Sequence, residues 1–280
     1  MSTPEYCELD PTIFLADGDH PEKAANPPDL LILNQPITDF ASFSRLWKHT
    51  NYRICADGGA NRLHDMFNGK LEKQRAQYVG DQSAFHLHTG HLTLTKLPNI
   101  IHGDLDSLRD DVRAYYESHD VEVLRDGDQY STDFGKTLSK ISARHNAASQ
   151  KDVLILGTLA GRVDQGLGLL HEMMREETKH PNLRLWLFSE SSLSMILRSR
   201  RTAVRSLLSS GLFTENLGLV PVYGPATIST TGLEWDVKDW FTQMGGQVST
   251  SNHVKADEVQ VETDQPILFT IERAPLEQQL

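Results

Sequence analysis

The sequence predicts a parallel-sheet α/β domain followed by an antiparallel β-sandwich domain. Between residues 30 and 190, short runs of continuous apolar residues alternate with segments whose apolar residues recur at helical spacing. Strands that are apolar throughout are typical of a parallel sheet covered by helices on both faces. After about residue 190, short runs that alternate apolar and polar residues are separated by Gly and Thr-Thr-Gly turns. This second pattern is typical of antiparallel strands with one buried face.

Apolar runs mark the strands of the first domain, and helical spacing marks the segments between them. The expected strands are 30–33, 52–56, 99–102, 121–124, 153–156 and 183–188. The expected helices contain Phe40, Phe43 and Trp47; residues 61–67; Val112, Tyr115 and Tyr116; Phe134, Leu138 and Ile141 after a start near Thr132; and Leu167, Leu170 and Met174. Strands that alternate with helices run parallel, and such sheets bind ligands outside the carboxyl ends of their strands.

The composition along the chain suggests a lead-in and two domains. Residues 1–29 are rich in Pro, Asp and Glu and are expected to form a loosely ordered lead-in. The α/β domain is expected over 30–190 and the β-sandwich over 191–280. The polar stretch 77–97 is interpreted as an insertion loop between a helix and a strand.

Composition and charge exclude several classes of protein. Of 280 residues, 39% are hydrophobic and 23% charged, as in ordinary folded, water-soluble proteins. The net charge of -11 argues against a general affinity for nucleic acid or anionic membranes. Cys7 and Cys55 cannot form a thiolate zinc site and indicate a reducing compartment. With no apolar run of membrane-spanning length and no signal-like start, the expected location is the cytoplasm.

Aspartates follow the predicted strands at the edge where ligands are expected. They are Asp57, Asp104 with Asp106, Asp133 and Asp164. Carboxylates gathered at one edge repel each other unless a cation joins them, and hard oxygen ligands favour Mg²⁺. Since Mg²⁺ usually completes its coordination with phosphate oxygens, the pattern predicts a bound nucleotide. The alternative is that individual aspartates such as Asp57 and Asp104 only cap turns or helices.

The loop between the strand 153–156 and the next helix carries a second phosphate-binding signal. Residues 157–161 begin and end with glycine, and Arg162 follows. Free backbone N–H groups at the start of a helix favour an anion, and the guanidinium fork suits phosphate. Glycines at such turns can also serve packing alone. Gly135, Lys136 and Thr137 look like the end of a P-loop, but Tyr130 occupies the required earlier glycine position.

Blocks of sequence spread over both predicted domains resemble those of the thiamine pyrophosphokinase family. They are Leu33-Asn34-Gln35-Pro36; residues 56–61; residues 103–107; Asp128-Gln129 with Ser131-Thr132-Asp133-Phe134; Gly161-Arg162 with Asp164-Gln165; residues 229–233 with Trp235; Val248-Ser249-Thr250-Ser251-Asn252; and residues 261–264. The resemblance implies an α/β domain followed by a β-sandwich, and a homodimer whose active sites form where the subunits meet.

The resemblance also implies roles for particular residues. Asp57, Asp104, Asp106 and Asp133 would surround Mg²⁺ and the triphosphate of ATP. Gln129, Thr132, Lys136, Arg162 and Asp164 would line the ATP side, while Trp235 of the partner subunit, Ser249 and Asn252 would contact thiamine. The implied reaction transfers diphosphate from ATP to the thiamine hydroxyl and releases AMP, with Asp133 or Asp104 as the proton acceptor.

Some positions depart from the family pattern, and two other functions stay open. Leu105, Ala160 and Val163 replace a Phe, a Gly and a Phe, and Gly135 stands where Thr is frequent. These changes leave the charged positions intact but alter the shape expected for the nucleotide pocket. Residues 199–215 form a second stretch without a family counterpart. The alternatives are a diphosphokinase acting on another alcohol, such as a pterin, and a non-catalytic regulator that binds thiamine or a nucleotide.

Overall fold

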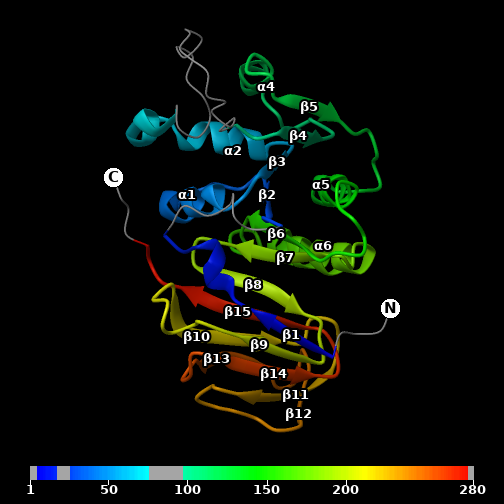
Figure 1. Ribbon diagram of the computed structural model, residues 1–280. Helices are drawn as coiled ribbons and strands as arrows, with labels where there is room; N and C mark the ends of the chain where they lie inside the picture. Colours follow the sequence, from blue (N-terminus) through cyan, green and yellow to red (C-terminus); the bar gives the residue numbers. More distant parts are fainter. Residues whose placement is uncertain (1–4, 18–25, 76–96, 277–280) are drawn as a thin grey trace. The chain divides into compact units, whose positions relative to one another are not determined.

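The computed structural model describes residues 5–17, 26–75 and 97–276, which divide into two compact units (Figure 1). The parallel-sheet unit comprises Pro21–Asp39 and Thr50–Arg184, and the β-rich unit comprises Met1–His20, Phe40–His49 and Leu185–Leu280. The second unit therefore includes N-terminal elements, whereas the sequence suggests a single boundary near residue 190.

The first unit contains five parallel strands in the order β6-β2-β3-β4-β5. Their bounds are β2 (Asp29–Ile32), β3 (Tyr52–Ala56), β4 (Ile100–Gly103), β5 (Glu122–Arg125) and β6 (Lys151–Leu156). The apolar residues of β2, β3 and β6 are almost all buried, because helices cover these strands. The prediction of a parallel sheet is confirmed.

Helices lie on both sides of this sheet. They are α2 (Gly59–Met66), α4 (Asp110–Glu117), α5 (Asp133–Ser142) and α6 (Val163–Lys179), with a short 3-10 helix, η3 (Gly69–Gln74). Helix α2 packs on α4 and α5 packs on α6. Figure 1 shows α2 and α5 on opposite sides of β2 and β3.

The buried face of α6 differs from the face marked in the sequence. Leu169 and Met173 are buried, whereas Leu167 is 63% exposed and Val163 is 74% exposed. The helical spacing of apolar residues could not distinguish the buried face of α6 from its exposed face, because apolar residues occur on both. The first two turns of α6 thus leave apolar side chains uncovered within the described structure.

The second unit contains two sheets. The first has the order β1-β9-β14-β11-β12, and the second includes the neighbours β13-β10-β15-β8-β7. The bounds are β1 (Tyr6–Leu9), β7 (Leu183–Phe188), β8 (Ser192–Leu197), β9 (Arg201–Val204), β10 (Phe213–Val220), β11 (Ala226–Thr231), β12 (Trp240–Thr242), β13 (Ser249–His253), β14 (Val259–Thr263) and β15 (Ile267–Arg273). The strands β1 and β9 pair in parallel, and the pairs that β10, β11, β14, β15 and β8 form with their neighbours in this unit are antiparallel, which confirms the C-terminal β-rich prediction.

Part of the lead-in belongs to this unit and is not loosely ordered. Strand β1 pairs with β9, and the 3-10 helix η1 (Pro11–Phe14) follows, capped by the Asp10 side chain. The ring of Phe14 lies 5.0 Å from that of Trp186, so it is anchored in the core. The helix α1 (Phe40–Lys48) is joined to β15 by a hydrogen bond from Arg273 Nη1 to Ser42 Oγ.

Of the two stretches without a family counterpart, 77–97 and 199–215, the structure describes the second and almost none of the first. Residues 77–96 of the first lie outside the described residues. The second, 199–215, contains β9 and the start of β10, so it contributes strands to both sheets. No helix among the described residues is both long enough and apolar enough to cross a membrane.

Candidate active site

Three of the predicted aspartates meet at the carboxyl edge of the parallel sheet. Asp57, Asp104 and Asp133 each offer a carboxylate oxygen, and these oxygens all lie within 4.8 Å of one another. Asp57 is only 3% exposed. The strand-to-helix connections thus bring together side chains that are far apart in sequence, as predicted.

Local structure explains how each of these carboxylates is aimed. Asp57 follows β3 with a φ of 43°, and Asp133 opens α5, whose N-cap is Thr132. Gly103 ends β4 between them: a Cβ there would lie 2.7 Å from Asp133 Oδ1 and 3.0 Å from Asp57 Cβ. Because only glycine leaves this space free, the close approach of the two carboxylates depends on Gly103.

The electrostatics of the cluster favour a bound cation. Burial raises the pKa of Asp57, and the charges of Asp133 and Asp104 raise it further, while a hydrogen bond from the Ser107 amide opposes this shift. Asp57 Oδ1 is buried and has no hydrogen-bond partner within the described part of the chain. A buried carboxylate oxygen without a donor is costly unless a cation reaches it.

Lys136 supplies a positive charge beside this cluster. Its side chain is 2% exposed, and Nζ lies 3.6 Å from Asp104 Oδ2 and 3.4 Å from Asp133 Oδ1. Its place on α5, one turn after Asp133, explains the contact. One ammonium group cannot balance three carboxylates, so negative charge remains at the site.

Asp106 is not among the three residues whose carboxylate oxygens lie together, so its share in a metal site with Asp104 stays a prediction. Leu105 has a φ of 65°, so the chain turns sharply between the two aspartates instead of running extended. The Asp106 amide donates to Asp104 Oδ1, and the Asp106 carboxylate accepts from the Ser107 hydroxyl. The two-residue spacing of Asp104 and Asp106 could not reveal this turn, because leucine rarely adopts a left-handed backbone conformation.

Side chains of α2 hold the loop that carries Asp104. Asn61 Nδ2 donates to Ser107 O at 2.7 Å, and Asn61 Oδ1 accepts from the Arg109 amide at 3.2 Å. Arg109 forms a two-bonded ion pair with Asp65, with N–O distances of 2.6 and 2.7 Å. Sequence reasoning assigned no role to Asn61, Asp65 or Arg109, because these polar residues form no recognisable catalytic motif.

The Asp65–Arg109 pair is expected to make stability pH-dependent at low pH. Hydrogen bonds from Arg109 lower the pKa of Asp65 to about 2. A lowered carboxyl pKa adds stability above the unfolded value of about 4, and this contribution disappears as the pH falls from about 4 towards 2. The pair is more than one-third exposed, so the effect is below about 1 kcal/mol. Urea unfolding of the wild type and Asp65→Asn should show a stability difference at pH 6 that shrinks below about pH 4; a constant difference would contradict the assignment.

The predicted ATP-side residues of α5 and its preceding loop differ in their surroundings. Thr132 accepts from the Gly135 amide and donates its hydroxyl to Glu172 Oε2 at 2.6 Å. Gln129 is exposed, and its amide nitrogen is 3.5 Å from Gly127 O. Thr132 is therefore fixed between α5 and α6, whereas Gln129 faces solvent.

Arg162 and Asp164 lie at the start of α6 and bind each other. Arg162 donates to both carboxylate oxygens of Asp164, at 3.1 and 2.6 Å, and both side chains are largely exposed. The hydrogen bonds from Arg162 lower the pKa of the Asp164 carboxyl group. The loop 157–162 does connect β6 to α6 as predicted, but the amide of Ala160 already donates to Thr158 Oγ1.

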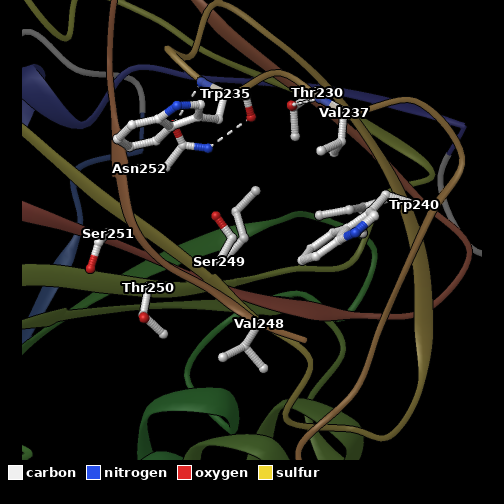
Figure 2. A pocket seen from close by; sticks show the side chains of 11 residues that line it. Thr230, Trp235, Val237, Trp240, Val248, Ser249, Thr250, Ser251 and Asn252 are labelled. Carbon is white, nitrogen blue, oxygen red and sulfur yellow. Dashed lines mark hydrogen bonds between the residues drawn. The ribbon is translucent and has the colours of Figure 1, made fainter. Parts of the chain in front are cut away.

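The three residues predicted to contact thiamine line one cavity of about 300 Å³ in the β-rich unit (Figure 2). Asn252 Oδ1 accepts from the Trp235 amide at 3.1 Å, and Asn252 Nδ2 donates to Trp235 O at 3.0 Å. These bonds hold the backbone of Trp235, although the residue is 54% exposed. Ser249, on β13, contributes to the wall. A second tryptophan of the wall, Trp240, was missed, although its proximity to Trp235 in sequence was a usable signal.

Comparison with known proteins accounts for both units. Residues 43–187 match the family model "Thiamin pyrophosphokinase, catalytic domain", and residues 204–268 match "Thiamin pyrophosphokinase, vitamin B1 binding domain". Thiamine pyrophosphokinase 2 of Arabidopsis thaliana is 33% identical over 247 residues, which cover 86% of this chain and 85% of that protein. Thiamine pyrophosphokinase of Saccharomyces cerevisiae is 29% identical over 299 residues, covering 90% and 87%.

A solved structure extends the similarity to the fold of almost the whole chain. Thiamin pyrophosphokinase from Candida albicans superposes with a TM-score of 0.79 at 25% identity, covering 98% of this chain and 95% of that one. The family models match most of the chain, and the sequence similarity spans both units. The chain therefore belongs to the thiamine pyrophosphokinase family.

Proposed function

We propose that this chain transfers a diphosphate group from Mg·ATP to the hydroxyl of thiamine, giving thiamine diphosphate and AMP. The observation that carries the proposal is the cluster of Asp57, Asp104 and Asp133, with a buried oxygen that has no donor among the residues the structure describes. Membership of the family supplies thiamine and ATP as the substrates. The cluster supplies the reason to expect phosphate chemistry that depends on a divalent cation.

The three carboxylates fit Mg²⁺ by their chemistry. They are hard oxygen ligands, they carry excess negative charge, and Asp57 Oδ1 has no donor among the described residues. Asp57, Asp104 and Asp133 would hold the ion, which when bound neutralises phosphate charge. Asp106 is left out of this proposed set because its carboxylate is not among those that lie together in the described structure.

The remaining charged residues have proposed roles on the ATP side. Lys136 would fix the Asp104 and Asp133 carboxylates through its contacts with both. Arg162 would exchange its exposed partner Asp164 for a phosphate oxygen, since a guanidinium fork suits either group. Thr132 and Gln129 would line the nucleotide pocket, and Thr132 is already oriented by Glu172.

In the proposed reaction the thiamine hydroxyl oxygen attacks the β-phosphorus of ATP. The bond from this phosphorus to the oxygen shared with the α-phosphate breaks, and AMP leaves with that oxygen. Asp104 or Asp133 would accept the hydroxyl proton. Most of the rate enhancement would come from positioning and charge neutralisation.

We also propose that the chain acts as a homodimer in the cytoplasm, with Trp235 reaching the partner's active site. The uncovered Val163 and Leu167 of α6 and the exposed Trp235 support association, because such side chains are often buried between subunits. The acidic net charge of -11 supports a protein without nucleic acid or membrane partners.

Product analysis with ATP, Mg²⁺ and thiamine tests the proposed function. We expect AMP and thiamine diphosphate in equal amounts, and no AMP when thiamine is omitted. Release of ADP would show γ-phosphoryl transfer instead. Turnover only with a pterin alcohol would support the related diphosphokinase, and thiamine binding without any product would support the non-catalytic regulator.

A further inference from the structure

The wall of the cavity in the β-rich unit has an unusual composition for a site that takes a cation. None of the eleven described side chains that line it is ionisable. The wall contains aliphatic side chains, small polar side chains and two tryptophans, Trp235 and Trp240. If a cation binds here, it cannot form an ion pair with the described wall, so its attraction comes from aromatic faces and from the oxygens of small polar side chains.

Strand geometry directs Trp240 into this cavity. Trp240 opens β12 and is paired with Ile228 of β11, a buried residue of the same wall. Side chains paired across a sheet share one face, and neighbours along a strand point to opposite faces. Phe241, the next residue, accordingly does not line the cavity and is 57% exposed.

The Trp240 ring is held by a hydrogen bond at its polar edge. Its indole Nε1 donates to Gln247 Oε1 at 3.1 Å, and Gln247 O accepts from the hydroxyl of Thr242 at 2.7 Å. These bonds tie the indole to the turn that joins β12 to β13. Figure 2 shows Trp235 and Trp240 on either side of the cavity. The ring is therefore positioned before any ligand arrives.

We propose that Trp240 is a second aromatic wall of the cavity and makes it selective for a permanently cationic, flat heteroaromatic ring. This inference rests on the proposed function, in which thiamine with its charged thiazolium is the acceptor. The face of an indole attracts a cation, and the attraction strengthens as the pair is removed from water. A neutral ring of the same shape gains the contact but lacks this attraction.

Trp240→Leu and Trp240→Phe test the proposal, with Phe241→Leu as the matched control on the opposite face of β12. We expect Trp240→Leu to raise the KM for thiamine about tenfold, with the KM for ATP and kcat nearly unchanged. Trp240→Phe should recover most of this loss, because a phenyl ring also attracts cations. Phe241→Leu should behave like the wild type.

The selectivity for charge gives a readout that a purely structural role would not change. Dissociation constants for thiamine and for deazathiamine, its neutral isostere, can be measured by quenching of tryptophan fluorescence without ATP. Trp47 and Trp186 are buried, so quenching reports on Trp235 and Trp240. The wild type should prefer thiamine, and Trp240→Leu should lose much of that preference. An unchanged preference in Trp240→Leu overturns the role of Trp240, whereas a wild type that does not bind thiamine overturns the proposed function itself.

Discussion

Asp57→Asn is expected to lower the turnover of ATP and thiamine by about 10²–10³-fold while the fold stays intact. Asparagine keeps the shape of the side chain and can still accept the hydrogen bond from the Ser107 amide. It removes one of the three charges that would hold Mg²⁺. The loss should appear mainly in kcat, because the bound cation would neutralise the charge that develops on the phosphate oxygens as the bond to AMP breaks.

The same replacement is expected to stabilise the protein when divalent cations are absent. The raised pKa of Asp57 shows that its charged form is disfavoured by burial and by Asp133 and Asp104. Relief of this repulsion is expected to raise the Tm by a few degrees at most. With Mg²⁺ added, the wild type should gain thermal stability and Asp57→Asn should gain little.

Asp120→Asn is the matched control for this experiment. Asp120 is an exposed turn residue with a φ of 60°, a conformation that asparagine adopts readily. It should leave the turnover and the response to Mg²⁺ unchanged. Wild-type turnover in Asp57→Asn, or an equal response of the two variants to Mg²⁺, would remove Asp57 from the metal site.

Asp29→Ala is expected to destabilise the chain by about 3–5 kcal/mol, a large part of a typical unfolding free energy. Asp29 begins β2 and is 2% exposed, and its carboxylate lies 3.0 Å from Lys151 Nζ and 2.7 Å from His145 Nε2. Removal of the carboxylate leaves the buried ammonium of Lys151 without its ionic partner. The pair lies at the amino ends of β2 and β6, away from the candidate active site at the carboxyl ends.

Urea unfolding measures this effect, and two further variants separate its causes. The double variant Asp29→Leu with Lys151→Met should recover much of the loss, because apolar residues can replace a buried ion pair without leaving a charge behind. Glu117→Ala removes an exposed ion pair with Arg113 and should cost below about 1 kcal/mol. An effect of Asp29→Ala no larger than that of Glu117→Ala would show that the buried pair contributes little.

Elements with strong local signals could be predicted from the sequence. The strand expected over 52–56 is β3, and the helix expected from Thr132 is α5 with Thr132 as its N-cap. Continuous apolar runs and capping residues are local properties, so they identify elements without knowledge of the partners. The parallel order of the strands then placed Asp57, Asp104 and Asp133 at one edge.

Features that depend on distant partners or single backbone angles could not be predicted. The pairing of β1 with β9 joins residues nearly two hundred positions apart, and no local pattern in the lead-in indicates it. The turn between Asp104 and Asp106 depends on the left-handed conformation of Leu105. The exposure of Leu167 depends on which of the two apolar faces of α6 is buried.

The most direct measurement is the anomalous scattering of Mn²⁺, as a substitute for Mg²⁺, in crystals grown with a non-hydrolysable ATP analogue. We predict a peak within about 2–2.5 Å of carboxylate oxygens of Asp57, Asp104 and Asp133, with phosphate oxygens of the analogue on its open side. A nucleotide bound with its metal away from these three side chains would contradict the proposal that they hold the ion and its phosphates.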